Sequence, residues 1–201
     1  LDVYTNDVFA SALKANKYVS VIASEELSGE EKGLDVENGY AVAYDPLDGS
    51  SLVDVNLAVG SIFGFYKGNS FIGQKGRDQA AALVTVYGPR LTMMLSVGRG
   101  VSEFVYDPQK KDFFLSRENL QLDETKKMFA PGNLKACDSE KWYCDLMEYW
   151  MKNGYTLRYS GGMAPDINQI LKKGGGIFTY PGSKEMPDGK LRLLFECAPV
   201  A

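Results

Sequence analysis

Short apolar runs alternate with polar turns along most of the chain, which predicts a mixture of helices and strands. Residues 6–14 carry apolar side chains at helical spacing after the capping-type residues Thr5 and Asn6, so a helix is expected there. Residues 18–23 and 39–44 are short β-prone runs and are predicted strands. Further strands are predicted at residues 53–66, 83–87, 91–97, 101–106 and 113–115. Gly, Pro and Asp turns separate them, as is typical of hairpins.

The rest of the chain continues this mixed pattern. Residues 138–152 form an amphipathic helix pattern in which Trp142, Leu146 and Trp150 recur at i, i+4 and i+8, so these side chains are expected in the core. A second helix is predicted over residues 166–173, before three consecutive glycines. Strands at 177–180 and 191–195 are expected to complete the sheet. The polar stretch 119–127 marks a seam between two layered halves of an α/β (α+β) protein.

Composition excludes several classes of function. The 201 residues have 45% hydrophobic content and a net charge of −4, which offers no basic footprint for nucleic acid. No stretch is long and apolar enough to span a bilayer, and no signal peptide pattern is present, so no membrane partner and a cytoplasmic location are expected. A plastid is the alternative if a transit peptide has been removed. Cys137, Cys144 and Cys197 indicate neither a disulfide framework nor a zinc site. With 0 His, imidazole-based nucleophilic catalysis is excluded, which favours carboxylates and metal-activated water.

The run Asp45-Pro46-Leu47-Asp48-Gly49-Ser50-Ser51 is a candidate site for a metal ion and a phosphate. Pro46 cannot donate to a β-ladder, so the strand over residues 39–44 is expected to stop near Asp45. Asp45 and Asp48 could then turn to one side of the loop, where carboxylates bind Mg²⁺ or Mn²⁺. Gly49, Ser50 and Ser51 supply small side chains and N–H donors that an anion can approach. The alternative is an ordinary turn, because Asp, Gly and Ser are common turn formers.

A second acidic pair, Glu25 and Glu26, follows the strand predicted at residues 18–23. If this strand and the strand at 39–44 run parallel, both acidic pairs lie at their carboxyl ends, where ligands collect in open α/β sheets. Several carboxylates held together would repel one another, so the arrangement favours two or more bound cations. The alternative for Glu25 and Glu26 is a solvated acidic loop.

The chain resembles the class I fructose-1,6-bisphosphatase and sedoheptulose-1,7-bisphosphatase family. The residues that carry the resemblance are Ser24-Glu25-Glu26, the Asp45–Ser51 run, Gly60-Ser61-Ile62-Phe63-Gly64, and the run from Lys190 to Pro199. The resemblance covers nearly the whole chain and implies a layered αβαβα sugar-phosphatase fold with mixed sheets. The chain looks like a portion of a family member from which both ends are missing. A metal-binding half over residues 1–118 and a sugar- and distal-phosphate-binding half over 119–201, truncated at its C-terminus, are expected.

The resemblance also implies roles for individual residues. It assigns two or three Mg²⁺ ions, or Mn²⁺ as an alternative, to the side chains of Glu25, Asp45, Asp48 and Glu196 and the backbone carbonyl of Leu47. It assigns proton relay to Glu26 and Asp2. Contacts with the sugar and the distal phosphate fall to Asn133, Arg158, Tyr159, Met163, Tyr180 and Lys190. Arg158 is expected to reach a neighbouring subunit's site, which implies a homodimer or homotetramer, whereas Arg192 is expected to be a solvated charge.

The activity implied is Mg²⁺-dependent hydrolysis of the 1-phosphate of fructose 1,6-bisphosphate or sedoheptulose 1,7-bisphosphate. Residues 128–136 and 155–169 look most like the sedoheptulose branch, whereas residues 195–201 and Tyr180-Pro181 look like the fructose branch. The alternatives are an inositol-type or nucleotide phosphatase with the same metal core, and a catalytically silent metal- or metabolite-binding fragment.

Overall fold

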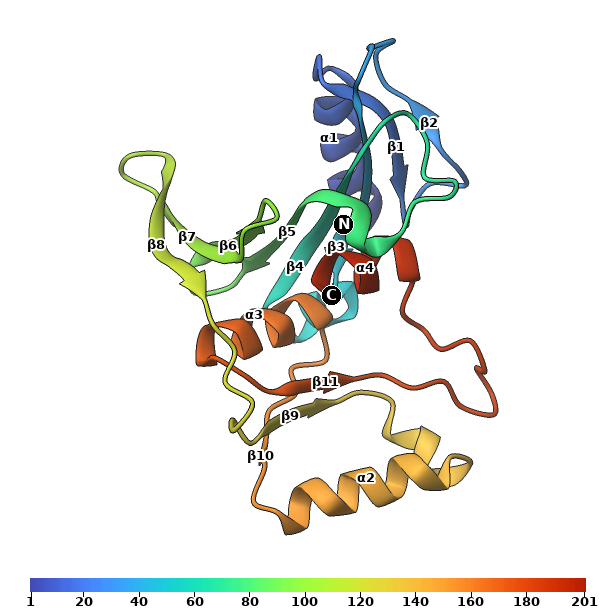
Figure 1. The fold of residues 1–201 in the computed structure, drawn as a ribbon, viewed down its shortest axis with the longest axis vertical. Coiled ribbons are helices and arrows are strands. Elements are labelled where there is room, and N and C mark those ends of the chain that lie inside the picture. Colours follow the sequence, from blue (N-terminus) through green and yellow to red (C-terminus); the bar gives the residue numbers. More distant parts are fainter.

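The computed structural model describes residues 1–201 and contains two β-sheets with helices between and outside them (Figure 1). The larger sheet has eight strands in the order β2-β1-β3-β4-β5-β6-β7-β8, and the smaller has three in the order β10-β9-β11. The strands of the larger sheet are β1 (Val19–Ser24), β2 (Glu31–Lys32), β3 (Tyr40–Asp48), β4 (Val59–Lys67), β5 (Gln79–Tyr87), β6 (Leu91–Ser96), β7 (Val101–Asp107) and β8 (Asp112–Leu120). Those of the smaller sheet are β9 (Met128–Pro131), β10 (Thr156–Leu157) and β11 (Ile177–Thr179).

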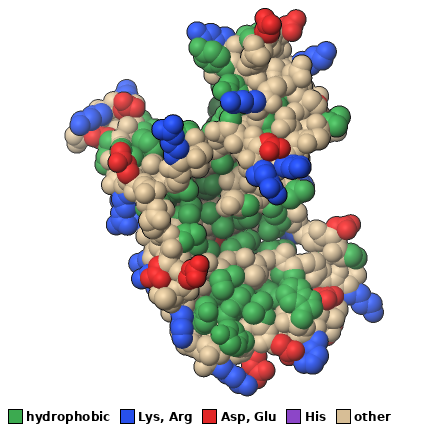
Figure 2. Space-filling model, in the orientation of Figure 1, with side chains coloured by type: hydrophobic (Ala, Val, Ile, Leu, Met, Phe, Trp, Pro, Cys, Tyr) green, Lys and Arg blue, Asp and Glu red, His purple; other side chains and the backbone are tan.

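The helices are α1 (Asp2–Lys14), α2 (Lys141–Lys152), α3 (Met163–Lys173) and the short α4 (Ala198–Val200). Three 3₁₀ turns, Ser50–Val55, Gly76–Asp78 and Leu134–Asp138, and one π turn, Leu193–Cys197, complete the chain. No helix has both the length and the apolar run that a bilayer crossing needs. On the face shown in Figure 2, Lys and Arg side chains are scattered among acidic ones and form no continuous basic surface.

Helices α1 and α3 cover opposite faces of the larger sheet. Ala10 of α1 packs in one cluster with Phe63, and Ala164 of α3 packs in another with Ile62. Ile62 and Phe63 are neighbours on β4, and successive strand residues point to opposite faces. The central strands are therefore buried on both sides.

The smaller sheet lies between α3 and α2 (Figure 1). Phe178 of β11 packs against the cluster that contains α3, whereas its neighbour Ile177 packs against the cluster that contains α2. Phe129 of β9 contacts Trp150 of α2, with ring centroids 5.2 Å apart. The layers therefore run α1, larger sheet, α3, smaller sheet, α2, which confirms the layered αβαβα mixed-sheet fold.

Several sequence predictions are confirmed. Strands β1 and β3 are parallel, whereas β5 to β8 form consecutive antiparallel hairpins. Helix α3 ends at Gly174, which has φ 76° and closes the helix in the left-handed conformation that glycine adopts without strain. Helices α1 and α3 each begin a few residues earlier than expected, at Asp2 and Met163.

The prediction that the second strand stops near Asp45 is wrong. Strand β3 continues through Pro46 to Asp48, with a register shift against β4 between Asp45 and Asp48. The hydroxyl of Ser61 on β4 donates to the Pro46 carbonyl at 2.8 Å, so a side-chain contact supports the stretch where regular pairing is lost. A bulge thus lets the strand accommodate a residue without an N–H.

Two other predicted strands are corrected. Residues 53–55 belong to a 3₁₀ turn that ends at Asn56 (φ 59°), and β4 begins only at Val59. The predicted strand at 191–195 is a turn instead, because the N–H groups of Glu196 and Cys197 both donate to the Arg192 carbonyl, at 3.1 and 3.2 Å. Those backbone groups are satisfied locally and do not extend a sheet. The short strands β2, β9 and β10 were not predicted, because runs of two to four residues carry little periodic signal.

Helix α2 presents a different face to the core from the predicted one. The buried residues are Tyr143, Met147 and Trp150, whereas Trp142 is 57% exposed. Trp142 donates its indole N–H to the half-buried Glu140 carboxylate at 3.1 Å. The predicted core role is therefore correct for Trp150 and wrong for Trp142.

Candidate active site

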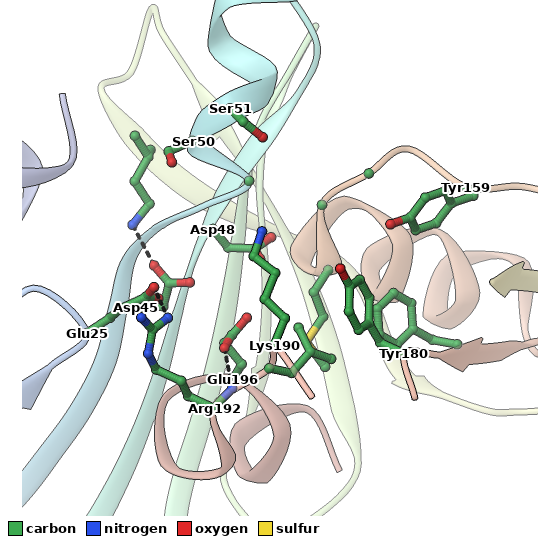
Figure 3. A pocket seen from close by; sticks show the side chains of 17 residues that line it. Glu25, Asp45, Asp48, Ser50, Ser51, Tyr159, Tyr180, Lys190, Arg192 and Glu196 are labelled. Carbon is green, nitrogen blue, oxygen red and sulfur yellow. Dashed lines mark hydrogen bonds and ion pairs between the residues drawn. The ribbon is translucent and has the colours of Figure 1, made fainter. Parts of the chain in front are cut away.

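A pocket opens where the end of β3 meets the start of α3 and the 190–196 segment (Figure 3). Its volume is about 140 Å³. It brings together residues that are far apart in the sequence. The predicted site residues that line it are Glu25, Asp45, Leu47, Asp48, Gly49, Ser50, Ser51, Tyr159, Met163, Tyr180, Lys190 and Glu196.

One side of the pocket, the acidic wall, consists of Glu25, Asp45, Asp48 and Glu196 (Figure 3). Carboxylate oxygens of Asp45, Asp48 and Glu196 all lie within 4.8 Å of one another. These three residues are only 4%, 6% and 6% exposed. Such closely spaced, buried carboxylates are unfavourable without neighbouring positive charge.

A backbone N–H orients each of these three carboxylates. Asp45 accepts from the Leu47 N–H at 2.9 Å, and Asp48 accepts from the Ala164 N–H at 2.6 Å. Glu196 accepts from the Arg192 N–H at 2.6 Å. The donors belong to β3, to the first turn of α3 and to the turn before α4, so three separate elements fix the cluster.

Burial raises the pKa of all three carboxyls. For Asp45, burial is the main cause, and the nearby charges of Glu25 and Asp48 add to the rise in pKa. Burial also raises the pKa of Asp48, against the lowering effect of hydrogen bonds from the backbone of Ala164 and Met163. The pKa of Glu196 rises to about 7, mainly through burial. A bound cation would favour the ionised forms, so these oxygen donors fit a hard divalent metal such as Mg²⁺ or Mn²⁺.

Arg192 lies on the same side of the pocket, and its predicted role as a solvated charge is wrong. Its guanidinium forms an ion pair with Glu25, whose side chain is 21% exposed, and its backbone N–H binds Glu196. Arg192 thus contacts two of the four acidic-wall residues. Its position four residues before Glu196 is the available signal, but the strand predicted at residues 191–195 would point successive side chains to alternate faces.

Tyr159 and Tyr180 lie on the opposite side of the pocket, and the Lys190 side chain runs between them and the acidic wall, with its ammonium beside Asp48 (Figure 3). These three residues are called the basic wall. The positive charge of Lys190 lowers the pKa of Asp48, which places the ammonium close enough to influence the acidic wall. Burial raises the pKa of the Tyr159 hydroxyl, which therefore stays protonated and can donate a hydrogen bond. An anionic group could thus be held by one ammonium and two phenol hydroxyls.

The turn after β3 forms the rim between the two walls. Gly49 has φ 80°, a conformation that glycine adopts most readily, and its neighbour Ser50 starts the 3₁₀ turn. Ser50 and Ser51 lie at this rim (Figure 3).

Two predicted contact residues lie outside the pocket lining. Asn133 donates its amide N–H to the Pro181 carbonyl at 2.8 Å, so it supports the segment that carries Tyr180. Arg158 is exposed, and its backbone N–H donates to the Phe129 carbonyl at 2.9 Å.

The two predicted proton-relay residues also lie outside the lining. Glu26 is exposed and follows directly on Glu25, with its N–H bound to the Ser24 hydroxyl at 3.2 Å. Asp2 is half-buried in the first turn of α1.

Sequence reasoning also missed a buried carboxylate next to the basic wall. Asp166 on α3 is 1% exposed and accepts from the Ser160 N–H with both oxygens, at 3.0 and 3.2 Å. Burial raises its pKa to about 6. It fixes the loop that carries Tyr159. Its position near a predicted helix start gave no sign of this role, since an acid there is common for reasons of capping.

Fold and pocket together define a mixed α/β protein with a buried cluster of carboxylates that could hold a cation and that faces basic and aromatic side chains. Comparison with known families matches residues 1–118 to the fructose-1,6-bisphosphatase N-terminal domain and residues 122–201 to the fructose-1,6-bisphosphatase C-terminal domain. The chain belongs to the fructose-1,6-bisphosphatase family, a family of phosphatases.

Relatives from both branches of this family are similar to the chain. The chain is 48% identical to a class 1 fructose-1,6-bisphosphatase of Geobacter metallireducens, over 100% of this chain and 63% of the relative. It is 43% identical to the chloroplastic sedoheptulose-1,7-bisphosphatase of Spinacia oleracea, over 100% of this chain and 52% of the relative. The crystal structure of Leishmania major fructose-1,6-bisphosphatase in holo form matches with a TM-score of 0.92 at 35% identity, over 100% of this chain and 67% of that one. The chain therefore spans less than two thirds of the length of these sequence relatives.

Proposed function

We propose that the protein containing this chain hydrolyses the 1-phosphate of a ketose bisphosphate in a reaction that depends on divalent metal. The observation that carries the proposal is the pocket itself, in which buried carboxylates within 4.8 Å of one another face Lys190 and two tyrosines. Cations held by the acidic wall would attract one phosphate and the basic wall would bind a second, which matches the two ends of a sugar bisphosphate. Relatives named for fructose 1,6- and sedoheptulose 1,7-bisphosphate support both as candidate substrates.

In this proposal the acidic wall and the Leu47 carbonyl hold two or three Mg²⁺ ions, with Mn²⁺ as a substitute. When bound, such ions supply Lewis acidity toward the phosphoryl group and lower the pKa of water. The chain's own contribution is to keep the carboxylates fixed through the N–H donors of Leu47, Ala164 and Arg192. The Glu25 carboxylate would then contact both a cation and the guanidinium of Arg192.

The N–H groups of Ser50 and Ser51 at the pocket rim would bind oxygens of the phosphate that leaves. A water oxygen forms the new bond to phosphorus, the bond from phosphorus to the sugar oxygen breaks, and the sugar oxygen takes up a proton. We assign removal of the water proton to Glu26, with Asp2 next in the relay. Both lie outside the pocket lining, so this assignment rests on the family resemblance and on the place of Glu26 beside Glu25.

Tyr159, Tyr180 and Lys190 would bind the distal phosphate, with Met163 against the sugar and Asn133 supporting the Tyr180 segment. Arg158 is exposed and separate from the pocket of its own chain, which suits a contact with a neighbouring subunit's site. We therefore propose a homodimer or homotetramer. In this assembly residues 1–118 supply most metal ligands and residues 119–201 supply the distal contacts together with Glu196. A cytoplasmic location, or a plastid after removal of a transit peptide, belongs to the same proposal.

The test is phosphate release by the intact protein from fructose 1,6-bisphosphate and sedoheptulose 1,7-bisphosphate with Mg²⁺, before and after chelation. We expect kcat/KM for the bisphosphates to exceed that for fructose 1-phosphate, inositol 1-phosphate and AMP by at least about 10²-fold, because only the bisphosphates reach the basic wall. Equal rates on monophosphates would favour the inositol-type or nucleotide phosphatase. Metal and sugar-phosphate binding without turnover would show a silent binding module.

A further inference from the structure

Two side-chain hydroxyls joined by a hydrogen bond lie beneath the acidic wall, outside the pocket. Ser61 on β4 is fully buried, and its hydroxyl donates to the Pro46 carbonyl at 2.8 Å. The same hydroxyl oxygen lies 2.9 Å from the hydroxyl of Tyr87 on β5. A serine hydroxyl has one proton, which here goes to Pro46, so Tyr87 must be the donor to Ser61. The order is Tyr87 to Ser61 to the Pro46 carbonyl.

Ser61 sits where the pairing of β3 with β4 is interrupted. Asp45 pairs with Ile62 and Asp48 pairs with Gly60, so Ser61 alone faces two residues, Pro46 and Leu47. Regular ladder pairing is lost at this bulge. Pro46 is fully buried, and a buried carbonyl requires a hydrogen-bond donor. The Ser61 hydroxyl supplies that donor.

The Ser61 hydrogen bond affects the acidic wall through one peptide group, the one that joins Pro46 and Leu47. The Pro46 carbonyl and the Leu47 N–H belong to the same planar peptide group, so fixing one fixes the direction of the other. The Leu47 N–H donates to the Asp45 carboxylate at 2.9 Å. Ser61 thus acts on Asp45 through a rigid unit, and the Leu47 carbonyl follows directly in the chain.

We propose that Ser61, with Tyr87 behind it, is a positioning residue that sets the metal affinity of the acidic wall. It contacts neither substrate nor metal. It holds the bulged peptide group that aims the Asp45 carboxylate and the Leu47 carbonyl. The inference rests on the proposed function, because it requires that the acidic wall binds a divalent cation.

The chain offers a matched control at the other end of β3. The Ser20 hydroxyl is also buried and also donates to backbone, sharing its one proton between the carbonyls of Tyr40 at 3.1 Å and Gly68 at 2.8 Å. Both serines thus join neighbouring strands of one sheet by a hydroxyl-to-carbonyl bond. Ser20 is not part of the pocket lining. Ser20→Ala should therefore reproduce the loss of sheet stability that Ser61→Ala causes, without its effect on metal.

The experiment is titration of the intact protein with Mn²⁺, with free Mn²⁺ followed by its paramagnetic resonance signal, alongside thermal unfolding without metal. Ser61→Ala should weaken Mn²⁺ binding by about 10–100-fold, the range found when groups that orient metal ligands are removed. Ser20→Ala should stay within about twofold of the unsubstituted protein. Saturating Mg²⁺ should bring kcat of Ser61→Ala back to within a few-fold, because the ligands themselves remain.

Mn²⁺ affinity that is unchanged in Ser61→Ala, or weakened equally in Ser20→Ala, would overturn the inference. If Ser61→Ala does not fold, Tyr87→Phe decides, since Tyr87 is 37% exposed and the ring is kept. A weakening of about threefold is expected there from loss of the donor behind Ser61, and an unchanged affinity would overturn the inference. Absence of Mn²⁺ binding by the unsubstituted protein would overturn the proposed function, and this inference with it.

Discussion

The two walls of the pocket are built in different ways. The acidic wall takes Asp45, Asp48 and Glu196 from the end of β3 and the turn before α4, each at most 6% exposed and each bound to a backbone N–H. The basic wall takes its groups from loops, and Tyr159 is 43% exposed. Lys190 is exposed as well.

These two arrangements suit different tasks, chemistry at the acidic wall and substrate selection at the basic wall. Groups that must hold cations in one geometry are placed on a sheet and fixed by backbone donors, whereas groups that contact a variable part of the substrate sit on loops that can change. Relatives named for a six-carbon and for a seven-carbon bisphosphate both align over 100% of this chain, at 48% and 43% identity. We therefore expect substitutions in the acidic wall to lower kcat and substitutions in the basic wall to raise KM.

The largest effect is expected at the acidic wall. Asp48→Asn keeps the side-chain volume but removes a charged ligand, so kcat for bisphosphate hydrolysis should fall on the order of 10³-fold. Steady-state phosphate release at saturating Mg²⁺ measures it. Asp54→Asn, in the exposed part of the following 3₁₀ turn, is the matched control and should stay near the unsubstituted rate. Retention of a tenth of the rate by Asp48→Asn would contradict the assignment of the acidic wall as the metal site.

A smaller loss is expected at the edge of the acidic wall. Glu26→Gln should lower kcat about 10²-fold with little change in KM if Glu26 accepts the water proton, and Asp2→Asn should have a weaker effect. Steady-state phosphate release at saturating Mg²⁺ measures both variants. Glu30→Gln, an exposed acid in the same loop, serves as the control. Rates for Glu26→Gln within twofold of the control would contradict this role and would show that Glu26 is a solvated acid of the loop.

The acidic wall was largely predictable from the sequence, and the reason is local. Asp45 and Asp48 lie three residues apart at the end of β3, and Glu25 follows a strand that was expected to run beside β3, so strand order alone brought them together. Glu196 came only from family resemblance. The turn that carries it depends on N–H groups that bind the Arg192 carbonyl, a choice that the apolar run from Leu191 to Phe195 does not reveal.

What the sequence could not show depends on contacts between distant residues. The role of Ser61 requires the register of β3 against β4, and a shift of one residue would move its hydroxyl to the other face of the sheet. The pairing of Arg192 with Glu25 joins residues from opposite ends of the chain. The helical period predicted for α2 is correct. Two neighbouring rows of apolar side chains run along this helix, and packing against Phe129 decides which of them faces β9.

The basic wall should give the converse kinetic pattern. Lys190→Met removes one charge-assisted contact with the distal phosphate, which should raise KM for a bisphosphate about tenfold and change kcat less than about threefold. Lys184→Met, at another exposed lysine of the same connection, is the control. A loss in kcat alone would instead show that Lys190 acts on the acidic wall. This alternative is specific, because the charge of Lys190 influences the pKa of Asp48.

The smallest predicted effect is on stability, and it separates the walls without any substrate. The folded state raises the pKa of Asp45, Asp48 and Glu196, the last to about 7, so it binds protons more tightly than the unfolded chain does. The stability contributed by these protons is complete below the unfolded pKa values, near 4, and is lost as pH rises through the folded ones. The metal-free protein should therefore melt at least about 5 °C lower at pH 8 than at pH 5.

Calorimetry of the metal-free protein at the two pH values measures this difference in Tm. Asp48→Asn should reduce the difference, because Asn carries no charge at either pH, whereas Asp54→Asn should leave it unchanged. Lys190→Met should enlarge it, because the positive charge of Lys190 opposes the rise in the pKa of Asp48. Mn²⁺ should raise the Tm at pH 8 more than at pH 5, since protons compete with the cation for the same oxygens. If Asp48→Asn and Asp54→Asn change the difference in Tm equally, the pH dependence comes from the general surface charge and not from the buried carboxylates of the acidic wall.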